Sequence, residues 1–189
     1  MKQKNWLFKA FVAWLPLAVV ITGICGLIYI VEQQHCRMAA NSPQIGLAQQ
    51  VAAAREQGQL ITSFIDIPFD IAGVQAPWII VYDNNQLPVA ASGLLNGKIP
   101  LIPQGVLDNS RDLDLNKVTW QPEPGVRQAI VVKYFTDNNG VPGYVVAGRS
   151  LTETEIQIEK LGLMVGLAYL ALLVTTFVVV AGSSKFNPA

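Results

Sequence analysis

The chain has 189 residues, of which 51% are hydrophobic and only 14% charged, with thirteen basic and thirteen acidic side chains. The zero net charge hides an uneven distribution. All thirteen acids and nine of the bases lie between residues 32 and 160, which gives that stretch a net charge of −4. Because nucleic-acid binding needs a clustered basic surface, this distribution excludes nucleic acid as an expected partner.

The first predicted element is a transmembrane helix over residues 10–31. This stretch carries no charge, and at ~1.5 Å per residue it is long enough to cross a hydrocarbon core of ~30 Å. The preceding Lys2, Lys4 and Lys9 would also suit a signal peptide, but the apolar core of a signal peptide has only ~7–15 residues. We therefore expect an uncleaved span rather than a signal removed near residues 38–40.

Residues 32–57 are predicted to extend this span as a helix. They are rich in Ala, Gln, Glu and Arg and lack the alternation of a strand. Pro43 predicts a bend near residues 41–43, and Gly58 is a suitable stop. Residues 59–75 are ambiguous, with Pro68 and Gly73 as turn signals.

Five short runs rich in β-branched and aromatic residues predict strands in the next part of the chain. Three of the connections, residues 83–86, 122–125 and 137–140, are short and consist of turn-forming residues. Short connections imply antiparallel neighbours. The predicted strands are residues 78–82, 87–92, 117–121, 126–135 and 143–148.

Two further segments complete the predicted domain. Residues 96–116 begin with Asn96-Gly97 and contain two prolines, so we expect them to cover one face of the sheet as a loop with a short helical turn. Ser150 stands three residues before Glu153, the pattern of a capping box, and predicts a helix over residues 151–160 that continues into a second uncharged span, residues 161–182. The fold class is α+β.

The positions of the basic residues predict the orientation in the membrane. Three lysines precede the first span, and Lys185 follows the second. The positive-inside rule then places both termini, residues 1–9 and 183–189, in the cytoplasm. Residues 32–160 are accordingly expected outside the plasma membrane as one extracytoplasmic domain.

This order of elements, a helix from the membrane, five antiparallel strands and a helix back into the membrane, resembles the PAS-like extracytoplasmic sensor domains of bacterial sensor histidine kinases. Several segments are also similar to the corresponding parts of kinase sensor regions and of small two-span sensor-like membrane proteins. These segments are residues 40–48 (ANSPQIGLA), 79–83 (IIVYD), 118–122 (VTWQP), 124–127 (PGVR) and 147–151 (AGRSL).

The resemblance implies a PAS-like sheet domain that senses a ligand and signals through its membrane helices. The kinases continue into an output domain, whereas only residues 183–189 follow the second span. We therefore expect a signal to pass sideways to another membrane protein. If the sequence is a piece of a longer receptor, the kinase would lie in the missing part.

The residue types of the exterior predict neither catalysis nor a metal or other cofactor. His35 is the single histidine and lies about one helical turn beyond the first span, which leaves no histidine-based triad deeper in the domain. Asp112, Asp114, Asn116 and Glu123 match part of a calcium loop. Its sixth position, however, needs glycine and here is lysine, and the spacing fits an exposed strand equally well.

Ligand binding is the function for which the sequence offers candidate residues. In a PAS-like domain a small molecule can lie between the sheet and its covering loops, where aromatic and basic side chains would line or gate the site. The alternative is that the aromatics fill the core and that the arginines pair with acids such as Asp83. The candidates are Trp78, Tyr82, Trp120, Arg127, Tyr134 and Arg149.

Two functions remain open from the sequence. The first is a noncatalytic sensor-like or interaction module that binds a ligand or protein and acts through a membrane partner, such as a sensor kinase, or as a homodimer. The second is a structural or assembly subunit of a larger membrane complex. Cys36 could cross-link two copies near a dimer axis, and Gly162 with Gly166 has a spacing that favours close contact between helices.

Overall fold

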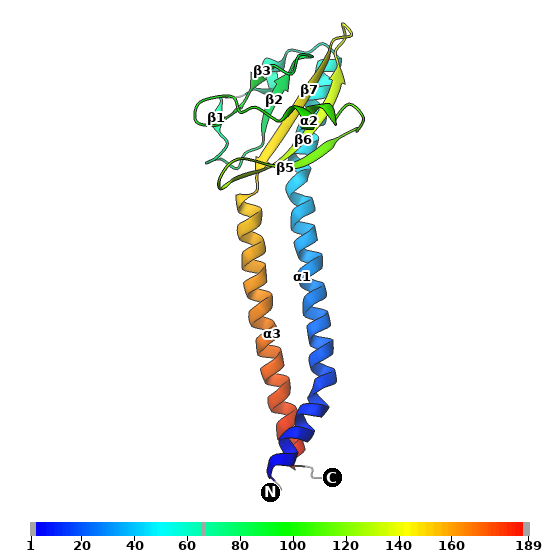
Figure 1. Cartoon of the computed structure of the whole chain (residues 1–189), viewed down its shortest axis with the longest axis vertical. Helices are drawn as coiled ribbons and strands as arrows, with labels where there is room; N and C mark the ends of the chain where they lie inside the picture. Colours follow the sequence, from blue (N-terminus) through cyan, green and yellow to red (C-terminus); the bar gives the residue numbers. More distant parts are fainter. Residues whose placement is uncertain (1–2, 66, 187–189) are drawn as a thin grey trace. The chain divides into compact units, whose positions relative to one another are not determined.

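The computed structural model describes residues 3–65 and 67–186 (Figure 1). The chain divides into two compact units. One contains the described residues up to Cys36 together with those from Ile156 onward, and the other contains residues 37–155. The first unit is a pair of helices, and the second holds all the β-strands and two short helical segments.

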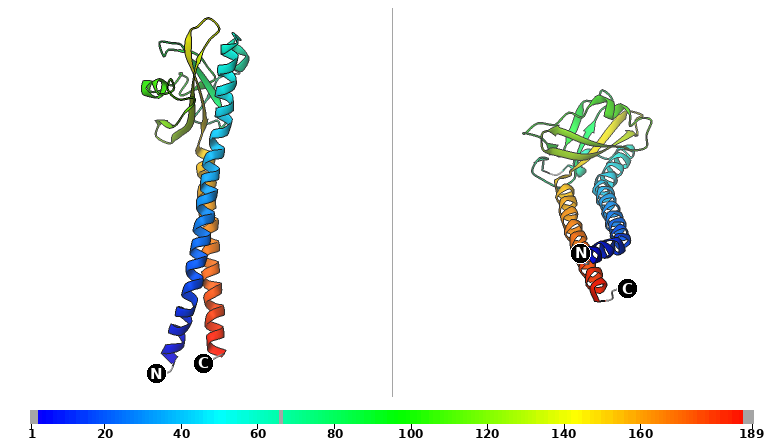
Figure 2. Two further views of the ribbon diagram at one scale, coloured as in Figure 1. Left: turned by 90° about the vertical axis from the view of Figure 1, so that its right-hand side faces the viewer. Right: turned by 60° about the horizontal axis from the view of Figure 1, so that its bottom comes forward.

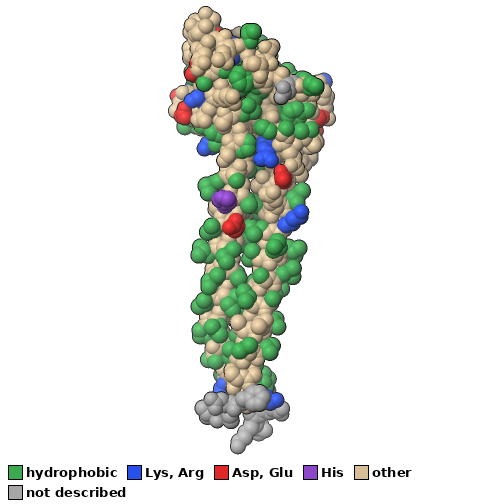
Figure 3. All heavy atoms as spheres, turned by 180° about the vertical axis from the view of Figure 1, so that it is seen from behind, with side chains coloured by type: hydrophobic (Ala, Val, Ile, Leu, Met, Phe, Trp, Pro, Cys, Tyr) green, Lys and Arg blue, Asp and Glu red, His purple; other side chains and the backbone are tan. Residues whose placement is uncertain are grey.

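The helix pair consists of parts of α1 (Gln3–Glu56) and α3 (Thr152–Phe186), both long and apolar enough to cross a membrane. About 20 apolar residues suffice to span a bilayer. Apolar side chains cover the outside of both helices (Figure 3), with Val19 63% and Leu163 66% exposed. Such a surface fits hydrocarbon better than water, which agrees with the predicted membrane association. The side on which each terminus lies stays a prediction.

The second unit is built on a five-stranded antiparallel sheet, as predicted (Figure 1). The observed strands agree with the predicted ranges within two residues at each end. They are β2 (Trp78–Tyr82), β3 (Pro88–Ala91), β5 (Asn116–Glu123), β6 (Val126–Thr136) and β7 (Pro142–Ser150).

The strand order is β3-β2-β7-β6-β5. The hairpins β2–β3, β5–β6 and β6–β7 follow from their short turns. The pairing of β2 with β7 joins segments about 65 residues apart, with Ile80 opposite Val146, and local sequence does not encode it. This pairing places β7, whose interior residues 143–148 are all buried, at the centre of the sheet.

The two faces of the sheet have different covers (Figure 2). On one face lies the last part of α1, which runs through residues 41–43 as uninterrupted helix. Its buried residues Gln44, Ala48, Val51 and Ala52 follow the helical spacing of one stripe. The apolar members of that stripe pack against alternate residues of the strands, including Val131.

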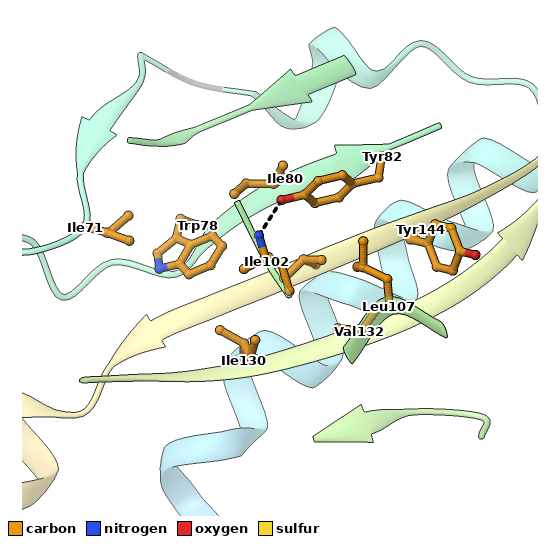
Figure 4. Close-up of a cluster of buried hydrophobic side chains, with 10 residues drawn as sticks. Ile71, Trp78, Ile80, Tyr82, Ile102, Leu107, Ile130, Val132 and Tyr144 are labelled. Atoms are coloured by element: carbon orange, nitrogen blue, oxygen red, sulfur yellow. Dashed lines mark hydrogen bonds between the residues drawn. The ribbon is translucent and has the colours of Figure 1, made fainter. Parts of the chain in front are cut away.

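The opposite face is covered by irregular chain. Its cover contains the short helix α2 (Gln104–Asp108), as the sequence predicts, and a small parallel pair of strands, β1 (Phe69–Asp70) and β4 (Gly93–Leu94). Ile102 and Leu107 from this cover join the core with Trp78 and Tyr82 from the sheet (Figure 4). A 3₁₀ turn, η1 (Ile61–Phe64), lies between α1 and β1.

The start of α3 differs from the prediction. Ser150 stays paired with Gln128 in the sheet, so the helix begins at Thr152, one residue later than expected. The Ser150 hydroxyl accepts a hydrogen bond from the Thr152 backbone N–H at 3.3 Å. The Glu153 carboxylate accepts from Arg149 Nη2 at 3.3 Å. The predicted capping box is therefore wrong, because Glu153 is engaged by the arginine that precedes the serine.

Candidate functional site: a cleft at the end of helix α1

Two of the six predicted ligand residues are wholly enclosed in the core. Trp78 and Tyr82 are 0% and 1% exposed. The Trp78 indole N–H donates to Gln128 Oε1 at 3.1 Å. The Tyr82 hydroxyl donates to the Pro100 carbonyl and accepts from the Ile102 backbone N–H, both at 3.3 Å (Figure 4). Burial raises the pKa of the Tyr82 phenol to about 12, with the Ile102 hydrogen bond opposing.

Trp120 and Tyr134 lie on the same face and are partly buried against that core. The Trp120 ring meets Trp78 edge-on with centroids 6.2 Å apart, and Tyr134 meets Tyr144 in the same way at 5.6 Å. Edge-to-face contacts of this kind stabilise aromatic cores. The four aromatic candidates therefore form one packed layer of side chains.

The two arginine candidates are on the other face. Successive residues of a strand point to opposite sides, and Arg127 and Arg149 alternate with Gln128 and Ser150. Arg127 forms an exposed ion pair with Glu155. Arg149 donates to the Gln75 carbonyl at 3.1 Å and pairs with Glu153. The sheet thus separates the four aromatic candidates from the two arginines. The geometry does not bring the six residues together in one pocket, and their assignment to one ligand site stays a prediction.

A cleft of about 290 Å³ lies elsewhere in the same unit. Its walls come from the last turn of α1, η1, the adjoining ends of β2 and β3, and the β6–β7 hairpin. Three charged side chains, Arg55, Asp83 and Asp137, line it together with aliphatic ones that include Ile61, Val89 and Val141. Of the predicted candidates, Tyr82 also borders this cleft.

Two turns of like sequence hold the carboxylates in place. Residues 83–85 and 137–139 both read Asp-Asn-Asn. Asp83 Oδ1 accepts from the backbone N–H groups of Asn85 and Leu87 at 2.9 and 2.8 Å. Asp137 Oδ1 accepts from the N–H groups two and four residues on, both at 2.9 Å. These Asx turns occupy one carboxylate oxygen each and leave Oδ2 for other partners.

The fourth turn position shows how the two hairpins differ. Gly140 has φ +78°, and its equivalent Gln86 has φ +61°. Positive φ suits glycine and is strained for a residue with a side chain. The shared backbone hydrogen bonds, Asp83 with Leu87 and Asp137 with Val141, hold both turns in this shape regardless.

Arg55 is incompletely satisfied by the protein. Its Nη1 donates to the Gln59 carbonyl at 3.0 Å. Its Nη2 lies 3.8 Å from Asp137 Oδ2, beyond the 2.7–2.9 Å typical of a charge-assisted hydrogen bond. Its Nε is buried and has no hydrogen-bond partner among the described residues. An unpaired buried donor costs about 1–3 kcal/mol, so this guanidinium retains capacity for an acceptor.

The cleft therefore combines a cation with spare donors, two oriented carboxylates and an aliphatic wall. Such a set is chemically suited to bind and orient a small charged molecule. The sequence alone does not identify this cleft, because Arg55 and Asp137 are 82 residues apart and meet only in the fold. The available signals were the repeated Asp-Asn-Asn and an arginine in the final turn of a helix otherwise rich in alanine.

Three of the residues that match part of a calcium loop have separate ion-pair or hydrogen-bond partners. Asp114 pairs with Lys133, and Glu123 accepts from Asn96 Nδ2 at 2.7 Å. Asn116 Nδ2 donates to the Val106 carbonyl at 2.8 Å. These contacts account for the alternating acids as parts of a strand and its neighbouring loops.

The helix pair has a cavity of its own. The Thr22 and Tyr169 hydroxyls are 3.1 Å apart and hydrogen-bonded, and Trp14 Nε1 donates to Thr176 Oγ1 at 2.9 Å. Next to the first contact lies a groove of about 460 Å³. Its lining includes Gly26, Gly162, Gly166, Tyr29 and Tyr169.

No model of a known protein family matches the chain, and the curated proteins contain no match to it.

Proposed function

We propose that the chain is a noncatalytic, membrane-anchored sensor-like module. In this proposal residues 37–155 form a PAS-like domain outside the plasma membrane, a small ligand binds in the Arg55 cleft, and binding alters a membrane partner through the helices. The partner is a second copy of the chain or another membrane protein such as a sensor kinase. The homodimer would place the free Cys36 residues near the dimer axis.

One observation carries the proposal. Arg55 lies in the last turn of α1, and the same uninterrupted helix contains the first candidate span. A ligand that draws the Arg55 side chain therefore acts on the helix that contains the first candidate span. The sheet is also connected directly to the helix that contains the second candidate span, because β7 ends at Ser150 and α3 begins at Thr152.

The topology can be tested by reporter fusions. The charge pattern, acids between the spans and lysines in their outer flanks, supports an outside domain. A reporter at Asn96 should be active only outside the membrane, and one at Ala189 only in the cytoplasm. An outside signal from Ala189 would overturn the proposed orientation.

The function can be tested by purifying the full chain from native membranes in mild detergent and identifying the proteins that accompany it. The sensor-like module should bring a signalling or transport protein in less than stoichiometric amount, or only its own second copy. R55Q should change the amount of partner recovered. Lys117 on β5 is exposed and does not line the cleft, so it provides the control K117Q, which should not.

The groove in the helix pair favours the alternative, a structural or assembly subunit. Small residues let another transmembrane helix approach closely, and Gly162 and Gly166 border the groove. In the assembly subunit, a stoichiometric set of other membrane proteins should copurify. G166L should release them, because a leucine would fill the place of the approaching helix, whereas R55Q should leave them bound.

A further inference from the structure

We propose that the Arg55 cleft binds a small zwitterion, a molecule with an ammonium and a carboxylate on the same or neighbouring carbon atoms, such as a free α-amino acid with a short side chain. This inference rests on the proposed function, since it names the ligand class of the same site. It follows from three properties of the cleft: its unpaired donors, its oriented acceptors and its size.

The donors recognise the carboxylate. Arg55 Nη2 makes only the 3.8 Å ion pair with Asp137, and Nε makes no bond with the described residues. The side chain lines the cleft and is 24% exposed, whereas Nε is buried, so Nη2 is the donor offered to a ligand. A ligand carboxylate on Nη2 would form the short charge-assisted bond that Asp137 does not make.

The acceptors recognise the ammonium. Asp137 Oδ1 is occupied by two backbone N–H groups, whereas Oδ2 has the long Arg55 contact. Asp83 holds its Oδ1 in the same way, and its Oδ2 has a 3.5 Å contact with Asn85. Both carboxylates are fixed by their turns. An ammonium placed between them and the arginine would be bound by groups that need no reorganisation.

The charges favour a zwitterion over a simple ion. Two acids and one base line the cleft. A simple anion would be repelled by Asp83 and Asp137, and a simple cation would leave the spare donors of Arg55 unpaired. A zwitterion replaces one loose ion pair with two short ones, because its carboxylate pairs with Arg55 and its ammonium with the acids.

The volume and walls limit the ligand's size. About 290 Å³ is at the lower end of the ~300–1,000 Å³ usual for ligand pockets. The aliphatic side chains of Ile61, Val89 and Val141 form part of the lining. They suit a short apolar side chain, so L-valine is a suitable probe, with glycine, L-alanine and L-serine as smaller ones.

The test is titration calorimetry of the full chain in lipid nanodiscs with these four amino acids. At least one should bind. The matched half-ligands of L-valine are isobutylamine, which lacks the carboxylate, and isovalerate, which lacks the ammonium. Each should bind about tenfold or more weakly than the zwitterion, because each loses one charge-assisted bond.

Two variants separate the two halves of the site. R55Q should abolish the preference for L-valine over isobutylamine. D137N should reduce the preference over isovalerate, since only Asp83 then remains for the ammonium, while the amide oxygen of the variant can still accept the two backbone bonds of the turn. K117Q, at an exposed lysine on β5 that does not line the cleft, should bind like the unmodified chain. Unchanged thermal unfolding of each variant, followed by tryptophan fluorescence, establishes that the fold is retained.

The outcomes distinguish this inference from the proposed function. Binding that depends on Arg55 and Asp137 supports the ligand class, even where the ligand leaves the copurified partner unchanged and the sensor-like function fails. No binding by any of the four amino acids overturns the ligand class, and so does binding whose affinity is unchanged in both R55Q and D137N. In each of these cases, the amount of membrane partner that copurifies with R55Q tests the proposed function separately.

Discussion

The two faces of the sheet are covered by different kinds of structure, and their side chains differ accordingly. The face under α1 is mainly aliphatic, with residues such as Ala48, Val51 and Val131. The opposite face carries Trp78 and Tyr82, whose polar atoms bond to neighbouring groups. A helix satisfies its own backbone, whereas irregular chain leaves N–H and C=O groups that need partners. Aromatic side chains with polar tips both fill the space under the irregular chain and supply hydrogen-bond partners.

Gln128 illustrates the same rule. Its Nε2 donates to the Ile71 carbonyl in the irregular cover at 3.1 Å, and its Oε1 accepts from Trp78. On the helix face, Gln44 is equally buried, but it donates to the Ala40 and Ala129 carbonyls, and its Oε1 has no partner among the described residues. We therefore expect the buried glutamine of the irregular face, Gln128, to contribute to stability, and the buried glutamine of the helix face, Gln44, to contribute little.

The largest difference between the faces should come from truncating one core residue on each. W78A should lower the free energy of unfolding by about 3–5 kcal/mol, because it empties the largest side-chain site and unpairs Gln128. V131A on the helix face should cost about 2 kcal/mol. Chemical denaturation of the full chain in detergent measures both. Equal losses would contradict the greater dependence of the irregular face on its aromatic layer.

The two buried glutamines give a sharper comparison. Q128L should cost about 2–4 kcal/mol, because it leaves the Trp78 N–H and the Ile71 carbonyl unpaired. Q44L should change the free energy of unfolding by no more than about 0.5 kcal/mol, since the Ala40 carbonyl lies inside α1 and the Ala129 carbonyl lies in β6 between β5 and β7. The same denaturation experiment applies. A large loss from Q44L would show that its orphan oxygen is bound by an internal water.

Two glycines compare the faces at the level of the backbone. A Cβ at Gly148 would lie 2.2 Å from the Trp78 ring, so G148A should cost roughly 1–3 kcal/mol through overpacking. Gly46 in α1 has no atom within 4 Å of such a Cβ, and G46A should stabilise the helix by about 0.5–1 kcal/mol. Thermal unfolding should shift in opposite directions, and a common direction would contradict this account.

The last comparison concerns the Tyr82 hydroxyl, which faces the irregular cover. Y82F should cost about 1–2 kcal/mol, because two backbone groups of the irregular cover lose their partner. The pKa of Tyr82 is about 12 in the fold against about 10 in the unfolded chain. The folded state therefore binds the proton more tightly, and stability falls as the pH rises from about 10 to 12. Y82F should lack this fall, and a fall of the same size in Y82F would assign it to another group.

The sequence predicts more of the helix-covered face than of the other. The turns at residues 83–86 and 137–140 identify two hairpins, and the run of β-branched and aromatic residues gives the bounds of β2 correctly. The β2–β7 pairing and the partners of Gln128 depend on contacts between distant residues, which no local pattern contains. Arg55 was missed for the same reason. Its role depends on where Asp137 and Asp83 stand, not on its own neighbours in the chain.

The irregular cover also has a kinetic consequence. Its backbone hydrogen bonds are mostly short-range turns within the segment, and the Ile102 N–H is held by the Tyr82 side chain, whereas the strands β6 and β7 share a ladder along their whole length. Loss of a few side-chain contacts can therefore release residues 93–115 while the sheet and its helix stay intact. This segment should exchange its amide hydrogens first and be the earliest point of attack by a protease.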